Sequence, residues 1–120
     1  LELKDYLNLV NLSDIVLDPF PFGGCNTSFE AFDFNIPVIT KTSNILSGRF
    51  TTGLYLKMGF TDCIVNNSFE YVKLAVDIVN NEKLRNKIVR KIIDKKHLIF
   101  QNDDVIHEYK NLFINLINNK

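Results

Sequence analysis

One stretch, Asp14–Val38, constrains the fold of this chain more than any other part. Its Ile15–Leu17 run is short and continuously apolar, which predicts a strand covered on both faces that ends near Asp18. The loop that follows carries Gly23-Gly24, which gives the backbone freedom where a ligand can come close. Cys25–Ser28 then opens a helix whose free N–H groups and positive dipole end face back toward that loop. Strand, glycine loop and helix start, in this order, predict an anion site suited to phosphate groups.

The rest of the chain alternates between apolar runs of strand length and amphipathic stretches of helix length. We predict strands at 15–18, 36–40 and 61–65, and helices at 3–12, 27–34, 49–58, 67–80, from 82 onward and from 103 onward. Strands that alternate with helices imply parallel βαβ units with right-handed crossovers. The predicted fold class is therefore α/β, a Rossmann-like layered parallel sheet flanked by helices. Since three strands are few for such a sheet, we expect further strands before Leu1.

Apolar spacing predicts which helix side chains face the core, and polar residues predict where helices start and stop. The expected inward positions are Leu3, Tyr6, Leu7 and Val10 in the first helix, Phe69, Val72, Ala75, Val76 and Val79 after the third strand, Leu84, Ile88 and Ile92 in the next helix, and Val105, Tyr109, Leu112, Phe113 and Leu116 in the last. The expected boundary signals are a left-handed Asn35, a Gly59 cap followed by Phe60, an Asn67–Glu70 capping box, and Asp103-Asp104 before the last helix.

Composition narrows the classes of protein to consider. The 120 residues suit one domain, residues 1–120, and because the chain begins with Leu1 we expect a fragment of a longer protein. A net charge of zero argues against a nucleic-acid binder or a polybasic membrane surface, so the basic run at 83–96 predicts a solvated helix face. Cys25 and Cys63 stand in no metal-ligand pattern, which predicts free thiols, a reducing compartment and no metal.

Several residues near the predicted anion site have more than one interpretation. Thr27-x-x-Glu30 has capping-box spacing and needs no ligand, and Asn26 could serve only as the helix N-cap. Arg49 fits a donor-site or interdomain role as well as a surface salt bridge. Phe20 and Phe22 are loop aromatics that could wall a pocket or pack against a neighbouring half-domain.

Asp18, at a strand end, admits a further interpretation as the phosphoacceptor of a receiver-like signalling domain. The interval from Asp18 to Thr40 is too short for that fold, and no acidic pair precedes the residue. This alternative is therefore the weakest of those considered.

The spaced blocks DPFPFGGCNTSFEA, IPVIT and GRFTTGLYLKMG resemble the C-terminal nucleotide-binding half of the protein O-linked N-acetylglucosamine transferase and SPINDLY-like family. The resemblance runs from about Leu7 to Tyr109. It implies a C-terminal half-domain of a glycosyltransferase with the GT-B fold, incomplete in this chain. Relatives of this kind often carry tetratricopeptide repeats before the catalytic region.

The resemblance also implies roles for individual residues. Gly24, Cys25, Asn26 and Thr27 would contact the donor diphosphate, and Glu30 would bind the ribose hydroxyls, as carboxylates do with diols. Cys25 departs from the pattern, because the animal enzymes carry a His there and many bacterial relatives a Gly. A thiol supplies no cationic donor, so phosphate binding would depend on backbone N–H groups and the next two side chains.

The implied reaction moves a sugar, first of all N-acetylglucosamine, from a nucleoside diphosphate sugar to a protein Ser or Thr hydroxyl. The donor would be a UDP-sugar, or else a GDP-sugar, with no metal cofactor, because helix dipoles and cationic side chains stabilise the leaving diphosphate. Expected partners are this donor, a protein acceptor and the N-terminal GT-B half-domain of the same chain, in the cytoplasm, with neither nucleic acid nor membrane. Catalytic residues would lie before Leu1, so these residues alone would bind donor weakly and catalyse nothing. The alternative is a non-catalytic remnant that serves as a binding module.

Overall fold

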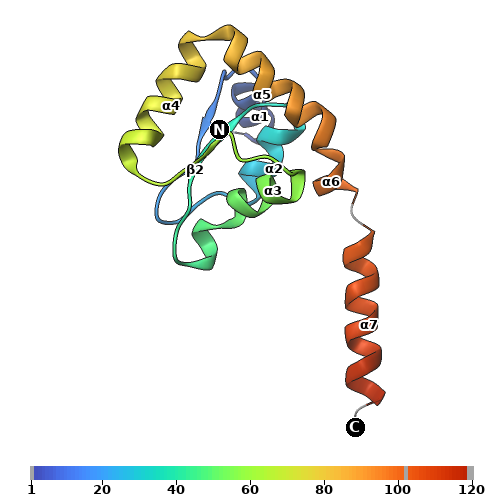
Figure 1. Cartoon of the computed structure of the whole chain (residues 1–120). Coiled ribbons are helices and arrows are strands. Elements are labelled where there is room, and N and C mark those ends of the chain that lie inside the picture. Colours follow the sequence, from blue (N-terminus) through green and yellow to red (C-terminus); the bar gives the residue numbers. More distant parts are fainter. Residues whose placement is uncertain (1, 102, 119–120) are drawn as a thin grey trace.

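The computed structural model describes residues 2–101 and 103–118. Figure 1 shows its elements in chain order: α1 (Leu3–Asn11), β1 (Val16–Leu17), α2 (Asn26–Asp33), β2 (Val38–Lys41), the 3-10 turn η1 (Leu46–Gly48), α3 (Phe50–Met58), β3 (Ile64–Val65), α4 (Ser68–Asn80), α5 (Glu82–Lys95), α6 (His97–Phe100) and α7 (Asp104–Asn118). The strands and longer helices lie where the sequence predicts them, and the short η1 and α6 are additional.

The sheet is parallel and has the order β1-β2-β3, which confirms the predicted α/β class. Val16 pairs with Val38, and Thr40 pairs with Ile64, so β2 lies in the middle. Residues 38–40 of β2 are all buried, because α2 and α3 cover one face of the sheet and α4 covers the other (Figure 1).

Tyr55 of α3 lies at the centre of the core and is fully buried. Its hydroxyl accepts a hydrogen bond from the Val38 N–H at 2.9 Å, and its ring packs edge-on against Phe32 and Phe60. Burial, and then the neighbouring Cys63, hold the pKa of Tyr55 well above its usual value. A neutral phenol therefore joins α3 to the first residue of the central strand.

The predicted boundary signals are confirmed in three places. Asn35 is left-handed at φ 63°, and Gly59 is left-handed at φ 80°, with the N–H of Phe60 bonded to the Tyr55 carbonyl at 3.3 Å. The side chain of Asn67 accepts the Glu70 N–H at 2.9 Å, so Asn67 caps α4 as predicted. The Glu70 carboxylate accepts from the Asn67 side-chain amide and from the Asn66 N–H, each at 2.9 Å, in place of the Asn67 backbone N–H of a regular capping box.

Helix α5 crosses the amino end of the sheet and pairs with the acidic residues that lie before the strands. These pairs are Arg85 with Asp14 at 3.4 Å, Lys91 with Asp62 at 2.8 Å, and Lys96, at the end of α5, with Asp33 at 3.7 Å. Lys96 also donates to the Asp33 carbonyl at 2.6 Å. The other basic residues of the run, Lys83, Lys87, Arg90 and Lys95, are exposed, as predicted for a solvated face. Part of the basic run thus anchors the helix.

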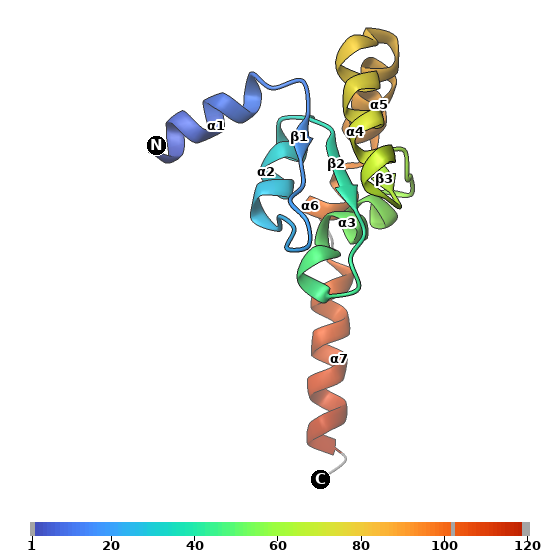
Figure 2. The same cartoon turned by 90° about the vertical axis from the view of Figure 1, so that its left-hand side faces the viewer.

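Two expectations about the edge of the sheet are wrong. β1 is not covered on both faces, since Leu17 is 50% exposed at the sheet edge. Helix α1, expected to turn Leu3 toward the core, extends to one side of the sheet and contacts α2 (Figure 2). Leu3 is exposed. Tyr6, Leu7 and Val10 do face inward, wholly or in part.

The predicted inward face of α4 is also wrong, except for Ala75. Apolar residues occupy most of the circumference of this helix, so spacing alone allows two inward sides. The side that packs against the core carries Tyr71, Leu74, Ala75 and Ile78. Four apolar side chains face outward: Phe69 at 77% exposure, Val72 at 61%, Val76 at 53% and Val79 at 43%. We call these four residues the α4 stripe.

Helix α7 extends away from the rest of the molecule (Figures 1 and 2). The predicted inward residues of this helix are all exposed, since no other described part of the chain covers them. Asp103 does accept the first helical N–H groups, those of Ile106 and His107, through its carbonyl. In the described residues, no helix has the length and apolar character needed to span a membrane.

Candidate functional site

Asp18 organises the carboxyl end of the sheet. It is 4% exposed, and its carboxylate accepts hydrogen bonds from the Gly24 N–H at 2.6 Å and the Thr40 hydroxyl at 2.7 Å. Its carbonyl accepts the Tyr71 hydroxyl at 2.9 Å. One residue therefore joins β1, β2, α4 and the glycine loop. Because this carboxylate is buried and its two oxygens are already hydrogen-bonded inside the protein, the geometry argues against the receiver-like alternative.

A second loop supports the glycine loop from the carboxyl end of β2. The Gly23 N–H donates to the Ser47 carbonyl at 3.1 Å, and the Ser43 N–H donates to the Gly48 carbonyl at 3.2 Å. Gly48 is buried, and a Cβ there would collide with the Pro21 carbonyl and the Ser43 side chain. The close approach of the two loops thus requires a glycine at this position, a role that the sequence pattern alone did not indicate.

Helix α2 begins differently from either capping prediction. The N-cap is Cys25 and no side chain caps the helix, so both Asn26 as N-cap and the Thr27–Glu30 capping box are wrong. Ser28 points inward, where its hydroxyl lies 2.7 Å from that of Thr51 on α3. The buried side of the start of α2 is therefore held by α3. Its other side, with Cys25, Asn26 and Thr27, is exposed.

An open hollow of about 390 Å³ lies in front of this helix start. It is lined by Pro19, Phe22, Gly23, Gly24, Cys25, Asn26 and Thr27. Within residues 2–101 and 103–118, the N–H groups of Cys25, Asn26 and Thr27 meet no hydrogen-bond acceptor. The Gly24 N–H is already bonded to Asp18. Unpaired donors at a positive helix end are the elements of an anion site.

Glu30 lies one turn further along α2, is half-buried and is not among the residues that line the hollow. Burial, and next a hydrogen bond to Glu30 and its negative charge, raise the pKa of Tyr6. The carboxylate predicted to bind ribose thus lies near a phenol of α1.

Arg49 and the loop aromatics take different positions. Arg49 is exposed and lines a separate hollow beside η1 and α3 with Leu46 and Phe50. It forms no ion pair with any described acidic residue, so the salt-bridge alternative is not realised there. Phe22 lines the α2 hollow, which is one of its two predicted positions. The Lys41 ammonium lies over the Phe20 ring, 3.9 Å from the ring centroid.

The two free cysteines have opposite surroundings. Cys25 is exposed at the mouth of the hollow. Cys63 is fully buried beside Tyr55, and burial raises the pKa of its thiol from 9.0 to about 11. A thiol reagent will therefore distinguish the hollow from the core.

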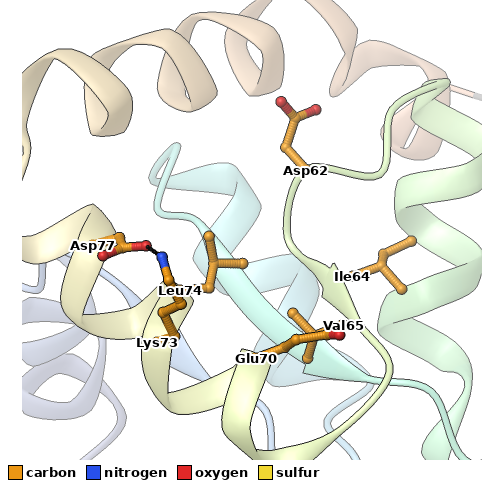
Figure 3. Close-up of a pocket in the computed structure, with 7 residues that line it drawn as sticks. All are labelled: Asp62, Ile64, Val65, Glu70, Lys73, Leu74 and Asp77. Carbon is orange, nitrogen blue, oxygen red and sulfur yellow. Dashed lines mark hydrogen bonds and ion pairs between the residues drawn. The ribbon is translucent and has the colours of Figure 1, made fainter.

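A further hollow, between β3 and α4, carries several charges (Figure 3). Lys73 pairs with Asp77 on α4, and Glu70 bonds to the capping residue Asn67. Asp62 is held by Lys91 of α5 at 2.8 Å. These charges are satisfied within the chain, so the hollow does not compete with the one at α2.

Comparison of the sequence with known proteins identifies glycosyltransferases as relatives of this chain. Curated relatives include the probable UDP-N-acetylglucosamine–peptide N-acetylglucosaminyltransferase SPINDLY of Hordeum vulgare, 30% identical over 95 residues, which are 76% of this chain and 10% of that protein. The Arabidopsis thaliana protein of the same name is 29% identical over 70% of this chain and 9% of its own length. The UDP-glucose:protein N-beta-glucosyltransferase of Actinobacillus pleuropneumoniae is 28% identical over 78% of this chain and 15% of its own length. No family model matches the chain.

Among solved structures, a mutant of the O-GlcNAc transferase of Thermobaculum terrenum superposes with a TM-score of 0.82 at 23% identity. The alignment covers 94% of this chain and 22% of that one. The chain belongs to the O-GlcNAc transferase and SPINDLY-like family of glycosyltransferases. This family membership confirms the resemblance, and the fold matches part of the GT-B fold. The chain spans about a tenth of the length of its plant relatives.

Proposed function

We propose that this chain is the donor-binding part of a glycosyltransferase that moves a sugar from a nucleoside diphosphate sugar to a protein side chain. The sugar we favour is N-acetylglucosamine from UDP, with glucose from UDP and fucose from GDP as alternatives. The acceptor we favour is a Ser or Thr hydroxyl, in a longer cytoplasmic protein that supplies the catalytic residues.

The observation that carries this proposal is the hollow at the start of α2, where three N–H groups lack acceptors among the described residues. A diphosphate placed there would accept from the backbone at Cys25, Asn26 and Thr27 and would lie at the positive end of the helix dipole. Because Cys25 brings no cation, these donors and the side chains of Asn26 and Thr27 would provide the binding. No metal is required by this scheme.

The remaining contacts follow from the same placement. Phe22, 71% exposed at the rim, offers an apolar wall to the base or sugar. Glu30 would bind the ribose diol through its carboxylate, close to the phenol of Tyr6. Arg49 keeps a proposed donor-site or interdomain role at the neighbouring hollow.

Cys25 offers a direct test, because it is exposed in the hollow while Cys63 is buried. In the full-length protein, alkylation of Cys25 followed by peptide mass spectrometry should slow about tenfold at saturating UDP-N-acetylglucosamine, as expected for a site about 90% occupied. UDP should protect equally, free N-acetylglucosamine should not, and a chelator should change neither result. Competition with UDP-glucose and GDP-fucose then ranks the donors.

Thr27→Ala should weaken this protection roughly tenfold, the cost of about 1.4 kcal/mol for one lost hydrogen bond to a charged group. Thr61→Ala, an exposed threonine outside the hollow, should not. If no nucleoside diphosphate or its sugar protects Cys25, the chain is a non-catalytic remnant and the transferase proposal is wrong.

A further inference from the structure

Helix α5 uses its basic residues in two ways. Some of them hold acidic residues at the amino end of the sheet, as described above. Three others, Lys83, Lys87 and Arg90, are exposed, and no ion pair joins them to an acidic residue within the ranges 2–101 and 103–118. These three cations therefore take no part in the ion pairs that attach the helix.

The three cations lie on one side of α5. Their spacing of four and then three residues places them in a row along the helix, about 10 Å long at about 1.5 Å per residue. A hollow of about 410 Å³ lies among their side chains, lined by Lys83, Asn86, Lys87 and Arg90. We call these four residues the α5 basic face.

The positive charges of this face are not balanced by the described part of the chain. Like charges at such spacing repel each other and destabilise a helix. Asp94 comes next on the same side, four residues after Arg90, yet it forms no ion pair with that arginine. Carboxylates brought by a partner would remove this repulsion.

We propose that the α5 basic face binds an acidic segment of another protein. The ammonium groups of Lys83 and Lys87 and the guanidinium of Arg90 pair with carboxylates of the segment. The Asn86 amide provides one further hydrogen-bond donor. Because α5 crosses the amino end of the sheet, the segment lies away from the α2 hollow at the carboxyl end. The proposal therefore does not depend on the proposed function.

The surroundings of the face favour a protein segment over a membrane. Glu82 and Asp94 are exposed near the two ends of the row, where they would repel a flat anionic surface. Helices that bind membranes insert an apolar side into the lipid. The apolar side of α5 instead packs in the core, through Leu84, Ile88 and Ile92.

The size of the face also argues against nucleic acid. Proteins that bind duplex DNA through its backbone commonly make about 6–10 phosphate contacts. The face offers three cations over about 10 Å, and the net charge of the chain is zero. A short peptide with a few neighbouring carboxylates matches this length and charge.

The first experiment measures binding of a fluorescein-labelled hexaglutamate peptide to the full-length protein by fluorescence anisotropy at low ionic strength. Lys87→Glu, at the centre of the face, should weaken binding about fivefold. Lys57→Glu makes the same charge change at an exposed position of α3 and should shift the affinity by less than about twofold. Hexaglutamine should not bind. No binding of hexaglutamate by the wild type, or equal losses in the two variants, would overturn the proposal.

The second experiment offers the same proteins other partners: vesicles of phosphatidylcholine with phosphatidylserine, and a short DNA duplex. Neither should bind the wild type more tightly than Lys87→Glu. If either does, and binds the wild type more tightly than hexaglutamate, the face belongs to a membrane or to nucleic acid and the proposal is wrong. Sedimentation should show the same mass for the wild type and Lys87→Glu; a dimer that Lys87→Glu dissociates would assign the face to a second copy instead. No arm contains a nucleotide sugar, so the proposed function can fail separately.

Discussion

The two ends of the sheet are built from different interactions. At the carboxyl end, the buried Asp18 carboxylate and the hydroxyls of Thr40, Ser28 and Thr51 form short hydrogen bonds inside the protein. At the amino end, α5 is held by ion pairs whose partners remain partly exposed, such as Lys91 and Asp62 at 36% and 27%. Buried hydrogen bonds to a charge contribute more to stability than solvent-exposed ion pairs.

The carboxyl end of the sheet therefore carries the candidate binding site, whereas the amino end only supports the fold. The carboxyl end uses its side chains internally and leaves backbone N–H groups of α2 facing the hollow. The amino end uses its side chains to attach one helix across three strand starts. Substitutions at the two ends should therefore differ in size and in what they affect.

The largest effect is expected for Asp18→Ala. The change leaves the Gly24 N–H and the Thr40 hydroxyl without their acceptor, which should cost about 3 kcal/mol in the free energy of unfolding by urea titration. Thr40→Val, which removes only one of the two bonds, should cost less. A loss below about 1 kcal/mol for Asp18→Ala would contradict its role as the connecting residue of this end.

The second effect is a loss of stability in alkaline solution that originates near the amino end. The pKa of Cys63 rises from 9.0 to about 11 on folding, so the unfolded thiol ionises first as pH increases. Stability is intact below pH 9 and should fall by about 1–2 kcal/mol on the way to pH 10.5. In Cys63→Ala this part of the loss should be absent, leaving that of the tyrosines whose pKa is also raised on folding, Tyr55, Tyr6 and Tyr71, at higher pH. Identical pH profiles for both proteins would refute the assignment.

The smallest effect is expected for Lys91→Met. The substitution removes the pair with Asp62 but keeps an apolar stem over Phe60, so the free energy of unfolding should change by about 0.5 kcal/mol. High salt should reduce the difference further. A loss comparable to that of Asp18→Ala would erase the contrast between the two ends.

The sequence predicted those features that depend on neighbouring residues. The three strands, the left-handed Asn35 and Gly59, the Asn67 cap and the glycine loop before α2 all follow from local signals, and all are present. The exposed start of α2 facing a hollow was likewise predictable from the order of strand, glycines and helix.

Features that depend on distant contacts were not predictable in the same way. Spacing alone could not choose between the two apolar sides of α4, because Tyr71 and Ile78 are as suitable for a core as Val72 and Val79. It also could not show that Asp18 would meet Thr40, since their contact is set by the register of β1 against β2. The capping prediction at Thr27–Glu30 failed because the chain enters α2 two residues earlier.

The Asp18 bonds bear on how tightly a small molecule could be held at the α2 hollow. Since the glycine loop is tied to both neighbouring strands before anything arrives, little backbone motion remains to be frozen on association. The conformational entropy lost on binding is then mostly that of the incoming molecule. A few hydrogen bonds from the main chain can therefore be enough for measurable affinity. A substitution that breaks the Asp18 bonds would therefore weaken binding at the hollow, although Asp18 itself does not line it.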